Sequence, residues 1–397
     1  MRSKTLMFSA LLLTGPALAF TLPNQSTLRP YECPACANLT HETLSLSWPI
    51  EDKALGHETL HEQSSRKYQI EASLQQLRKG VAIYTQAPGA LIRISPTNPN
   101  KKPTSEFQIK SSKGARLSLE DASSLFSKDE ALKETAFADN TLAVSQLKEE
   151  LGSGKFIVSS TADFSAQADE DSSFIIQVYD SNSSSELNIA TDKASYSYGE
   201  DLTATIRLRD ANIKYVIDSI AVTLTPPSGR KIVLDAKALS NNTYEAKYTM
   251  LSEKNDNGEN WHIDTKVEGS AGKRTIYRHT HTAFSYVIPS AAVKSISRTS
   301  ADSFNFSAKI EAATDSRYAL QTVLYGSDSK GKRHPLQTVQ TAAWLSTGLN
   351  TLKFSFDSNL KSDYKAPYYL GYTRLTDFGQ QKPVFVYDEL IELSKLD

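Results

Sequence analysis

From Leu187 onward, apolar and polar residues alternate, which is the pattern of side chains that point to opposite faces of a β-strand. Similar segments follow one another, separated by turn-forming stretches such as Pro226-Pro227-Ser228-Gly229. Roughly seven short strands within about a hundred residues are typical of an immunoglobulin-like β-sandwich. We therefore predict such a sandwich over residues 183–289. The clearest example of the alternation lies in the apolar residues Leu202, Ala204, Ile206 and Leu208.

The same alternation continues to the end of the chain. The stretch TVLYGSDSKGKRHPL, residues 322–336, predicts two strands joined by a tight turn between Ser327 and Gly331. The segments TLKFSFD, PYYLGYTRLTDFGQ and PVFVYDEL supply further strands. A second immunoglobulin-like sandwich is thus expected over residues 290–397.

Residues 20–182 differ, because their predicted strands, one of them around Leu44, Leu46 and Trp48, surround a stretch with helical spacing. We predict a helix over residues 119–151 in an α+β domain, so that the whole chain is mainly β. Ser127 and Glu130 have the spacing of a capping box at a helix start. Val144, Leu147 and Leu151 form an apolar stripe, and Gly152 is a suitable residue for the helix end. The short polar stretch at 179–186 is expected to be a linker into the first sandwich.

The first nineteen residues have the layout of a cleavable secretory signal, here assigned to residues 1–19. Arg2 and Lys4 precede a short apolar run, and Ala17-Leu18-Ala19 follows it. The run is too short for a transmembrane helix, which needs about twenty residues. We expect a soluble exported protein, periplasmic or extracellular, with no membrane insertion.

The charge balance argues against nucleic acid as a partner. The chain has 44 Lys and Arg against 45 Asp and Glu, and no basic stripe. Affinity for nucleic acid comes mainly from neutralising phosphates, which this composition does not favour. With 2 cysteines, the chain is also no disulfide scaffold.

His57-Glu58-x-x-His61 has the spacing of a zinc hydrolase motif. In such enzymes both histidines lie on a core helix and the glutamate polarises the metal-bound water. The surrounding residues 50–66 are mostly polar, and no Gly-x-x-His continuation follows. We favour a solvated connector and no cofactor. The alternative is a zinc-dependent hydrolase with His57 and His61 as metal ligands and Glu58 as the catalytic residue.

Cys33-Pro34-Ala35-Cys36 places two cysteines three positions apart. A thioredoxin-type redox centre would need a βαβ context, which the following sequence does not supply. We favour a small-loop disulfide between Cys33 and Cys36. A structural zinc site that also uses His41, His57 or His61 is the alternative.

Two further groups of residues are weaker candidates. His279 and His281 fall on one side of a predicted strand and His262 on a neighbouring strand, on faces that the alternation assigns to solvent. Near the C-terminus, tyrosines can form a surface for proteins or carbohydrates, although packing in the sandwich is the favoured use. These tyrosines are Tyr364, Tyr368, Tyr369 and Tyr372.

Three stretches carry a resemblance to a known family. GVAIYTQAPGALIRISP (80–96), ATDKASYSYGEDLTATIRLRD (190–210) and TAAWLSTGLNTLKFSFD (341–357), which PYYLGYTRLTDFG follows, are similar to segments of secreted Gram-negative bacterial proteins catalogued as a domain of unknown function. The resemblance covers essentially the whole mature chain. It implies export and an N-terminal α+β domain followed by two Ig-like domains, and it carries no established catalytic residues.

The sequence favours an exported binding protein that is not an enzyme, with an unknown protein or glycan as partner. Loops and strand edges of sandwiches bind partners without a catalytic cleft. The zinc hydrolase and a glycan-binding role of the N-terminal domain are the two alternatives. Neither the ligand nor the oligomeric state follows from the sequence.

Overall fold

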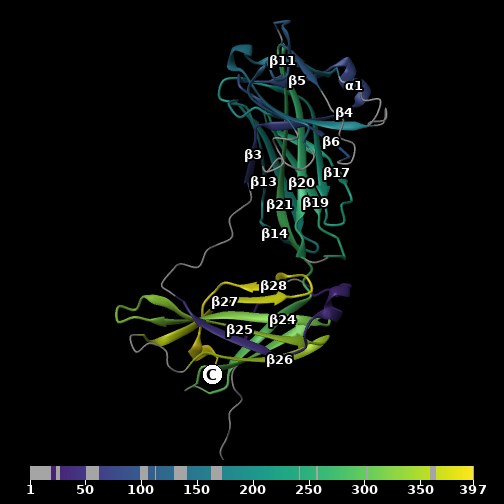
Figure 1. Cartoon of the computed structure of the whole chain (residues 1–397). Coiled ribbons are helices and arrows are strands. Elements are labelled where there is room, and N and C mark those ends of the chain that lie inside the picture. The colour runs from purple at the N-terminus through teal and green to yellow at the C-terminus, as the bar shows by residue number, and fades with distance from the viewer. Residues whose placement is uncertain are drawn as a thin grey trace, which may run out of the picture. The chain divides into compact units, whose positions relative to one another are not determined.

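The computed structural model of the chain confirms the mainly β fold (Figure 1). It describes residues 19–23, 27–50, 62–98, 106–111, 113–128, 141–161, 172–240, 242–255, 258–300, 303–357 and 364–396. These form two compact units. The N-terminal unit contains Glu58–Met250 and Asn260–Ser285; the C-terminal unit contains the chain before Glu58, Leu251–Glu259 and the chain from Tyr286 onward.

The first half of the N-terminal unit is a sandwich of two antiparallel sheets. One sheet has the order β4 (Lys67–Ser73), β12 (Ser173–Tyr179), β6 (Leu91–Pro96), β10 (Ala143–Leu147) and β9 (Ser123–Lys128). The other has the order β5 (Val81–Thr85), β11 (Gly154–Ser160), β7 (Phe107–Lys110) and β8 (Arg116–Ser118). Apolar residues of both sheets, among them Ile92, Phe156 and Phe174, join in one buried core.

The helix predicted over residues 119–151 is wrong in the described parts of that range. Ser127 lies in strand β9, while Val144 and Leu147 lie in β10, which pairs with both β6 and β9. Pairing on both sides satisfies the backbone of β10, and its apolar residues are buried, so tertiary contacts override the local helical spacing. Leu151 ends the 3-10 turn η2 (Glu149–Leu151), and Gly152 follows it with a φ of 74°. Glu130 lies outside the described residues.

The α-helix that the described residues do contain is α1 (Leu74–Lys79). It begins with a capping box, because Ser73 Oγ accepts from Gln76 N–H while the Gln76 side chain accepts from Ser73 N–H. It ends at Gly80, whose φ of 100° favours glycine. No helix in the described ranges has the length and apolarity needed to cross a membrane.

The second half of the N-terminal unit is the central sandwich. One sheet has the order β18 (Ala236–Ser240), β19 (Thr243–Thr249), β15 (Asp201–Arg209), β13 (Glu186–Thr191) and β3 (Glu62–Ser65). The other has the order β14 (Ser195–Ser197), β21 (Arg274–Val287), β20 (Trp261–Ala271), β16 (Val216–Thr225) and β17 (Ile232–Leu234). The rings of Trp261 and Tyr196 both pack against Phe284 in its core.

The polar stretch before β13, expected to be a simple linker, is a packed joint. Asp180, Ser183 and Ser185 are buried, and the fully buried Arg278 of β21 contacts all three. The Arg278 guanidinium and the Asp180 carboxylate are 2.8 Å apart. The two halves of the N-terminal unit are therefore held by a buried ion pair, which fixes how the strands around the candidate site face each other.

The C-terminal unit is a third sandwich. One sheet has the order β1 (Phe20–Thr21), β22 (Ala291–Arg298), β23 (Asn305–Ala312) and β26 (Gly348–Ser355). The other has the order β2 (Leu44–Pro49), β25 (Arg333–Leu345), β24 (Ser316–Ser327), β27 (Lys365–Asp377) and β28 (Lys382–Tyr387). The short β29 (Ile391–Glu392) also pairs with β27, before the 3-10 turn η4 (Leu393–Lys395).

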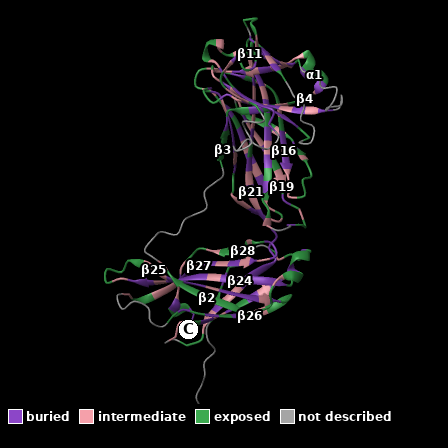
Figure 2. Cartoon of the chain, viewed as in Figure 1, coloured by how far each residue is buried: buried purple, intermediate pink, exposed green. Residues whose placement is uncertain are grey.

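An N-terminal arm, residues 19–50, belongs to this C-terminal unit. The strand around Leu44, Leu46 and Trp48 was expected in the N-terminal domain, but it is β2 and pairs with β25. Every residue of β2 is exposed, as Figure 2 shows in green. The alternation of β2 predicted a strand correctly, but it carries no information on which sheet the strand joins.

Candidate functional site

A polar cleft of about 260 Å³ lies within the N-terminal unit, between the first sandwich and the central sandwich. One wall consists of β4 and β12, with Lys67, Gln69, Gln177 and Tyr179. The other wall consists of β20 and β21, with Asp264, Lys266, His279 and His281. Four strands from distant parts of the sequence thus bring amide, hydroxyl, imidazole, ammonium and carboxylate groups to one place.

The strand register explains the polar wall on β20 and β21. Asp264 pairs with His281 and Lys266 with His279, so all four side chains lie on the same outward face. His281 and His262 are exposed, as the alternation predicted. His279 is half-buried, contrary to the expectation, because the first sandwich covers that part of the face.

His279 is held in one orientation in the cleft. Its Nδ1 accepts a hydrogen bond of 3.3 Å from the backbone N–H of Gln69. Burial, together with the nearby charge of Lys266, lowers the pKa of His279 to about 4. The neutral ring therefore carries its proton on Nε2 and presents that N–H as a donor.

The shifted pKa of His279 predicts a pH dependence of stability. Between the unfolded pKa of 6.5 and the folded pKa of about 4, the unfolded chain binds a proton that the folded chain does not, so stability is lost as the pH falls through this window. We expect the wild type to lose about 2 kcal/mol more of its unfolding free energy than His279→Gln across that window. Urea unfolding at both ends of the window measures the difference; equal losses in the two proteins would contradict it.

The opposite wall is also internally hydrogen bonded. The Tyr179 hydroxyl donates to Gln177 Oε1 at 3.2 Å, and Gln177 Nε2 lies 3.5 Å from Gln69 Oε1.

Within the described ranges, no group of three or more His, Cys, Asp and Glu side chains is placed to hold a metal ion. The cleft can therefore hydrogen bond a polar ligand through preformed donors and acceptors on both walls.

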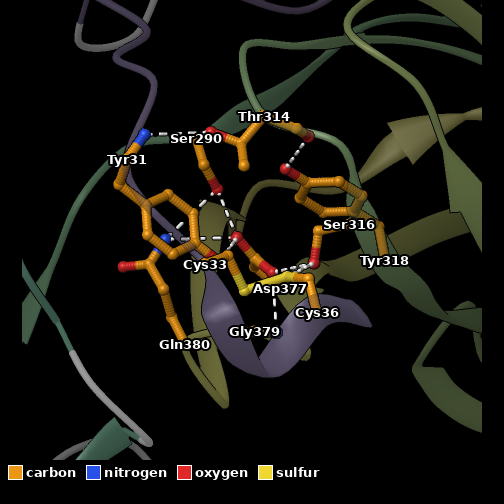
Figure 3. Close-up of a disulfide and its surroundings, with 10 residues drawn as sticks. All are labelled: Tyr31, Cys33, Cys36, Ser290, Thr314, Ser316, Tyr318, Asp377, Gly379 and Gln380. Carbon is orange, nitrogen blue, oxygen red and sulfur yellow. Dashed lines mark hydrogen bonds between the residues drawn. A yellow bond between two sulfur atoms is a disulfide. The ribbon is translucent and has the colours of Figure 1, made fainter. Parts of the chain in front are cut away.

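A second polar site lies in the C-terminal unit, where Cys33 and Cys36 form a disulfide with an S–S distance of 2.02 Å (Figure 3). Cys33 directly precedes the 3-10 turn η1 (Pro34–Asn38), and Cys36 lies within it. Gly379 lies directly under the sulfurs, and a Cβ there would come within 2.5 Å of Cys33 Sγ and 2.7 Å of Cys36 Sγ. The disulfide closes a small loop within the N-terminal arm, and this loop packs against the turn after β27.

Close to the disulfide, Asp377 is fully buried and surrounded by donors (Figure 3). Its carboxylate accepts from the hydroxyls of Tyr31 at 2.9 Å, Ser290 at 2.6 Å and Ser316 at 2.6 Å, and from Gly379 N–H at 2.9 Å. Burial and this carboxylate raise the pKa of Tyr31, so its hydroxyl stays protonated and keeps donating. Asp377 was not among the site residues predicted from the sequence. The sequence signal for a buried carboxylate is its position: Asp377 follows Leu375 by two residues in β27, so both side chains point to the buried face of the strand.

The remaining candidates are dispersed. His57, Glu58 and His61 lie outside the described residues, and His41 stacks on Trp344 with ring centres 3.9 Å apart. The four tyrosines of the predicted binding surface are all half-buried. Tyr368 packs on Phe304, and arginine side chains lie over Tyr369 and Tyr372.

Comparisons with known proteins agree on one family. Profiles for the N-terminal, central and C-terminal domains of DUF4785, a domain of unknown function, match residues 35–180, 183–287 and 290–394. The crystal structure of a DUF4785 family protein from Legionella pneumophila is 39% identical, with a TM-score of 0.82, over 95% of this chain and 100% of that chain.

A search among curated proteins finds no match. The native conformation of Escherichia coli alpha-2-macroglobulin overlaps 73% of this chain and 19% of that chain at 12% identity, with a TM-score of 0.28. A similarity at this level carries no function from that protein to this chain.

Proposed function

The chain belongs to the DUF4785 family, and we propose that it is an exported, non-catalytic binding protein that holds a hydroxyl-rich ligand, such as the end of a glycan, in the cleft between β4, β12, β20 and β21. The observation that carries the proposal is the preformed set of hydrogen-bonding groups on both cleft walls. Export is supported by the secretory layout of residues 1–19 and by the disulfide, since disulfides persist in oxidising compartments.

The chemistry of the walls favours a sugar over an apolar ligand. Each hydroxyl of a sugar both donates and accepts, and the cleft offers the N–H of His279, the ammonium of Lys266 and the carboxylate of Asp264 within one face. Its volume of about 260 Å³ lies below the usual range for a buried drug-sized ligand, so it suits one end of a longer chain. The fixed backbone of the four strands limits the entropy that binding costs.

The test is binding of the full chain to a glycan array, with a variant that fills the cleft. Gln177→Trp places an indole between the two walls and should weaken binding at least about tenfold. The matched control is Gln108→Trp, because Gln108 is a half-buried residue of β7 outside the cleft. If no glycan binds, or if both variants weaken binding equally, the proposed function is wrong.

A further inference from the structure

We propose that the Cys33–Cys36 disulfide is a thiol–disulfide exchange site for a cysteine-containing peptide, and that it does more than pin the N-terminal arm. The site belongs to the C-terminal unit and is independent of the cleft. Three observations carry this inference: the unequal exposure of the two sulfurs, a pocket beside Cys33, and a hydroxyl next to Cys36.

The two cysteines are not equivalent. Cys36 is buried, whereas Cys33 is partly exposed and lines a pocket of about 250 Å³ together with Tyr31, Glu32 and Asn255. An attacking thiolate must reach one sulfur and displace the other, so access selects the sulfur that is attacked. The arrangement makes Cys33 the attacked atom and Cys36 the leaving group.

Asn255 forms part of the pocket wall, and its amide is held in one orientation. Its Nδ2 donates to the carbonyl oxygen of Tyr286 at 2.7 Å and to Gln380 Oε1 at 3.0 Å. Because both partners are acceptors, the amide orientation is fixed and Oδ1 must point elsewhere. Oδ1 is buried and has no hydrogen-bond partner among the described residues, although a buried polar atom normally has one.

Ser316 connects the leaving sulfur to Asp377. Its Oγ lies 3.3 Å from Cys36 Sγ and 2.6 Å from Asp377 Oδ1 (Figure 3). A disulfide sulfur is a weak acceptor, so the hydroxyl proton lies toward Asp377 in the oxidised protein. When Cys36 leaves as a thiolate, the same proton can turn toward sulfur, while Asp377 keeps its hydrogen bonds from Tyr31 and Ser290.

Thiols are the only co-reactants that the exchange needs. A thiolate attacks Cys33 Sγ, a new S–S bond forms, and the Cys33–Cys36 bond breaks with its electron pair on Cys36, which then takes up a proton. A second thiol attacks the mixed disulfide and releases Cys33. The protein disulfide is reduced by two electrons and two thiols become one disulfide.

The test uses the full chain and reduced glutathione, with intact-mass measurement after alkylation. We expect the folded wild type to be reduced at a glutathione concentration that leaves its circular dichroism unchanged. In Cys36→Ser, the thiol of Cys33 should react with glutathione disulfide at least about tenfold faster than the thiol of Cys36 in Cys33→Ser, because access governs the rate.

The rates of reduction of Ser316→Ala and Ser290→Ala distinguish a disulfide that exchanges with thiols from one that only stabilises the fold. Both remove a buried hydroxyl that donates to Asp377, but only Ser316 lies beside Cys36. Ser316→Ala should slow the reduction by glutathione about tenfold, the usual effect of losing a hydrogen bond to a charged group, and Ser290→Ala should change it less than twofold. A wild-type disulfide that resists glutathione until denaturant unfolds the protein overturns the proposal, as does equal slowing in the two serine variants.

Discussion

Arg278→Ala should lower the unfolding free energy of the N-terminal unit by about 3–5 kcal/mol, the usual cost of leaving one partner of a buried ion pair alone. The side chains of Arg278 and Asp180 are 0% and 1% exposed, so water cannot replace the guanidinium. The arginine also donates to Ser183 Oγ and to the carbonyl oxygens of Ser185 and Tyr277. After its removal, the donors left to the Asp180 carboxylate among the described residues are the backbone N–H groups of Gln86 and Ala87.

The matched control is Arg66→Ala, which breaks an exposed pair with Glu186 in the same unit. The Arg66 side chain is 46% exposed, and such pairs contribute at most about 1 kcal/mol. Urea unfolding followed by circular dichroism compares the two variants with the wild type. Similar small losses in both would show that the joint between the first and central sandwiches does not depend on the buried pair.

Asp377→Ala should destabilise the C-terminal unit by at least about 3 kcal/mol, because each buried donor left unpaired costs about 1–3 kcal/mol. The hydroxyls of Tyr31, Ser290 and Ser316 all lose their acceptor. Tyr31 belongs to the N-terminal arm, so this variant should also expose the arm to proteases. We expect cleavage within residues 19–50 at a protease concentration that leaves the wild type intact.

Asp388→Ala serves as the control for Asp377→Ala. The Asp388 side chain is 63% exposed and pairs with Arg374, so its loss should change stability by less than about 1 kcal/mol. Calorimetric melting of the three proteins gives the comparison. If Asp377→Ala melts at the same temperature as the wild type and its N-terminal arm resists the protease, Asp377 does not hold the arm.

Alternation along the chain predicted the strands of both Ig-like sandwiches because one face of each strand is buried. Leu202, Ala204 and Ile206 are buried in β15 as expected. The turn between β24 and β25 also forms where it was predicted, with Gly331 at a φ of 78°. The helix predicted over 119–151 is wrong, because apolar residues at helical spacing also fit a strand that is buried on both faces, as the consecutive buried residues Ala143, Val144 and Ser145 of β10 show.

The two polar networks were missed, although both left a signal in the sequence. Arg278 occupies an inward-facing position of β21, between the buried Ile276 and Thr280. Asp377 likewise occupies an inward-facing position of β27. A charged residue in an apolar phase indicates a buried partner, but alternation cannot name that partner. Asp180 and Tyr31 come from segments far away in the sequence. The cleft was missed for the same reason, since its walls come from different sandwiches.

The most direct test of the central claim follows the histidine imidazoles by NMR while a glycan that binds on the array is added. The proposed function predicts that the signals of His279 and His281, which line the cleft, shift in a saturable manner, while those of His41 and His334 in the C-terminal unit stay unchanged. Saturable shifts confined to His41 or His334, with His279 and His281 unmoved, would contradict it and place the ligand elsewhere.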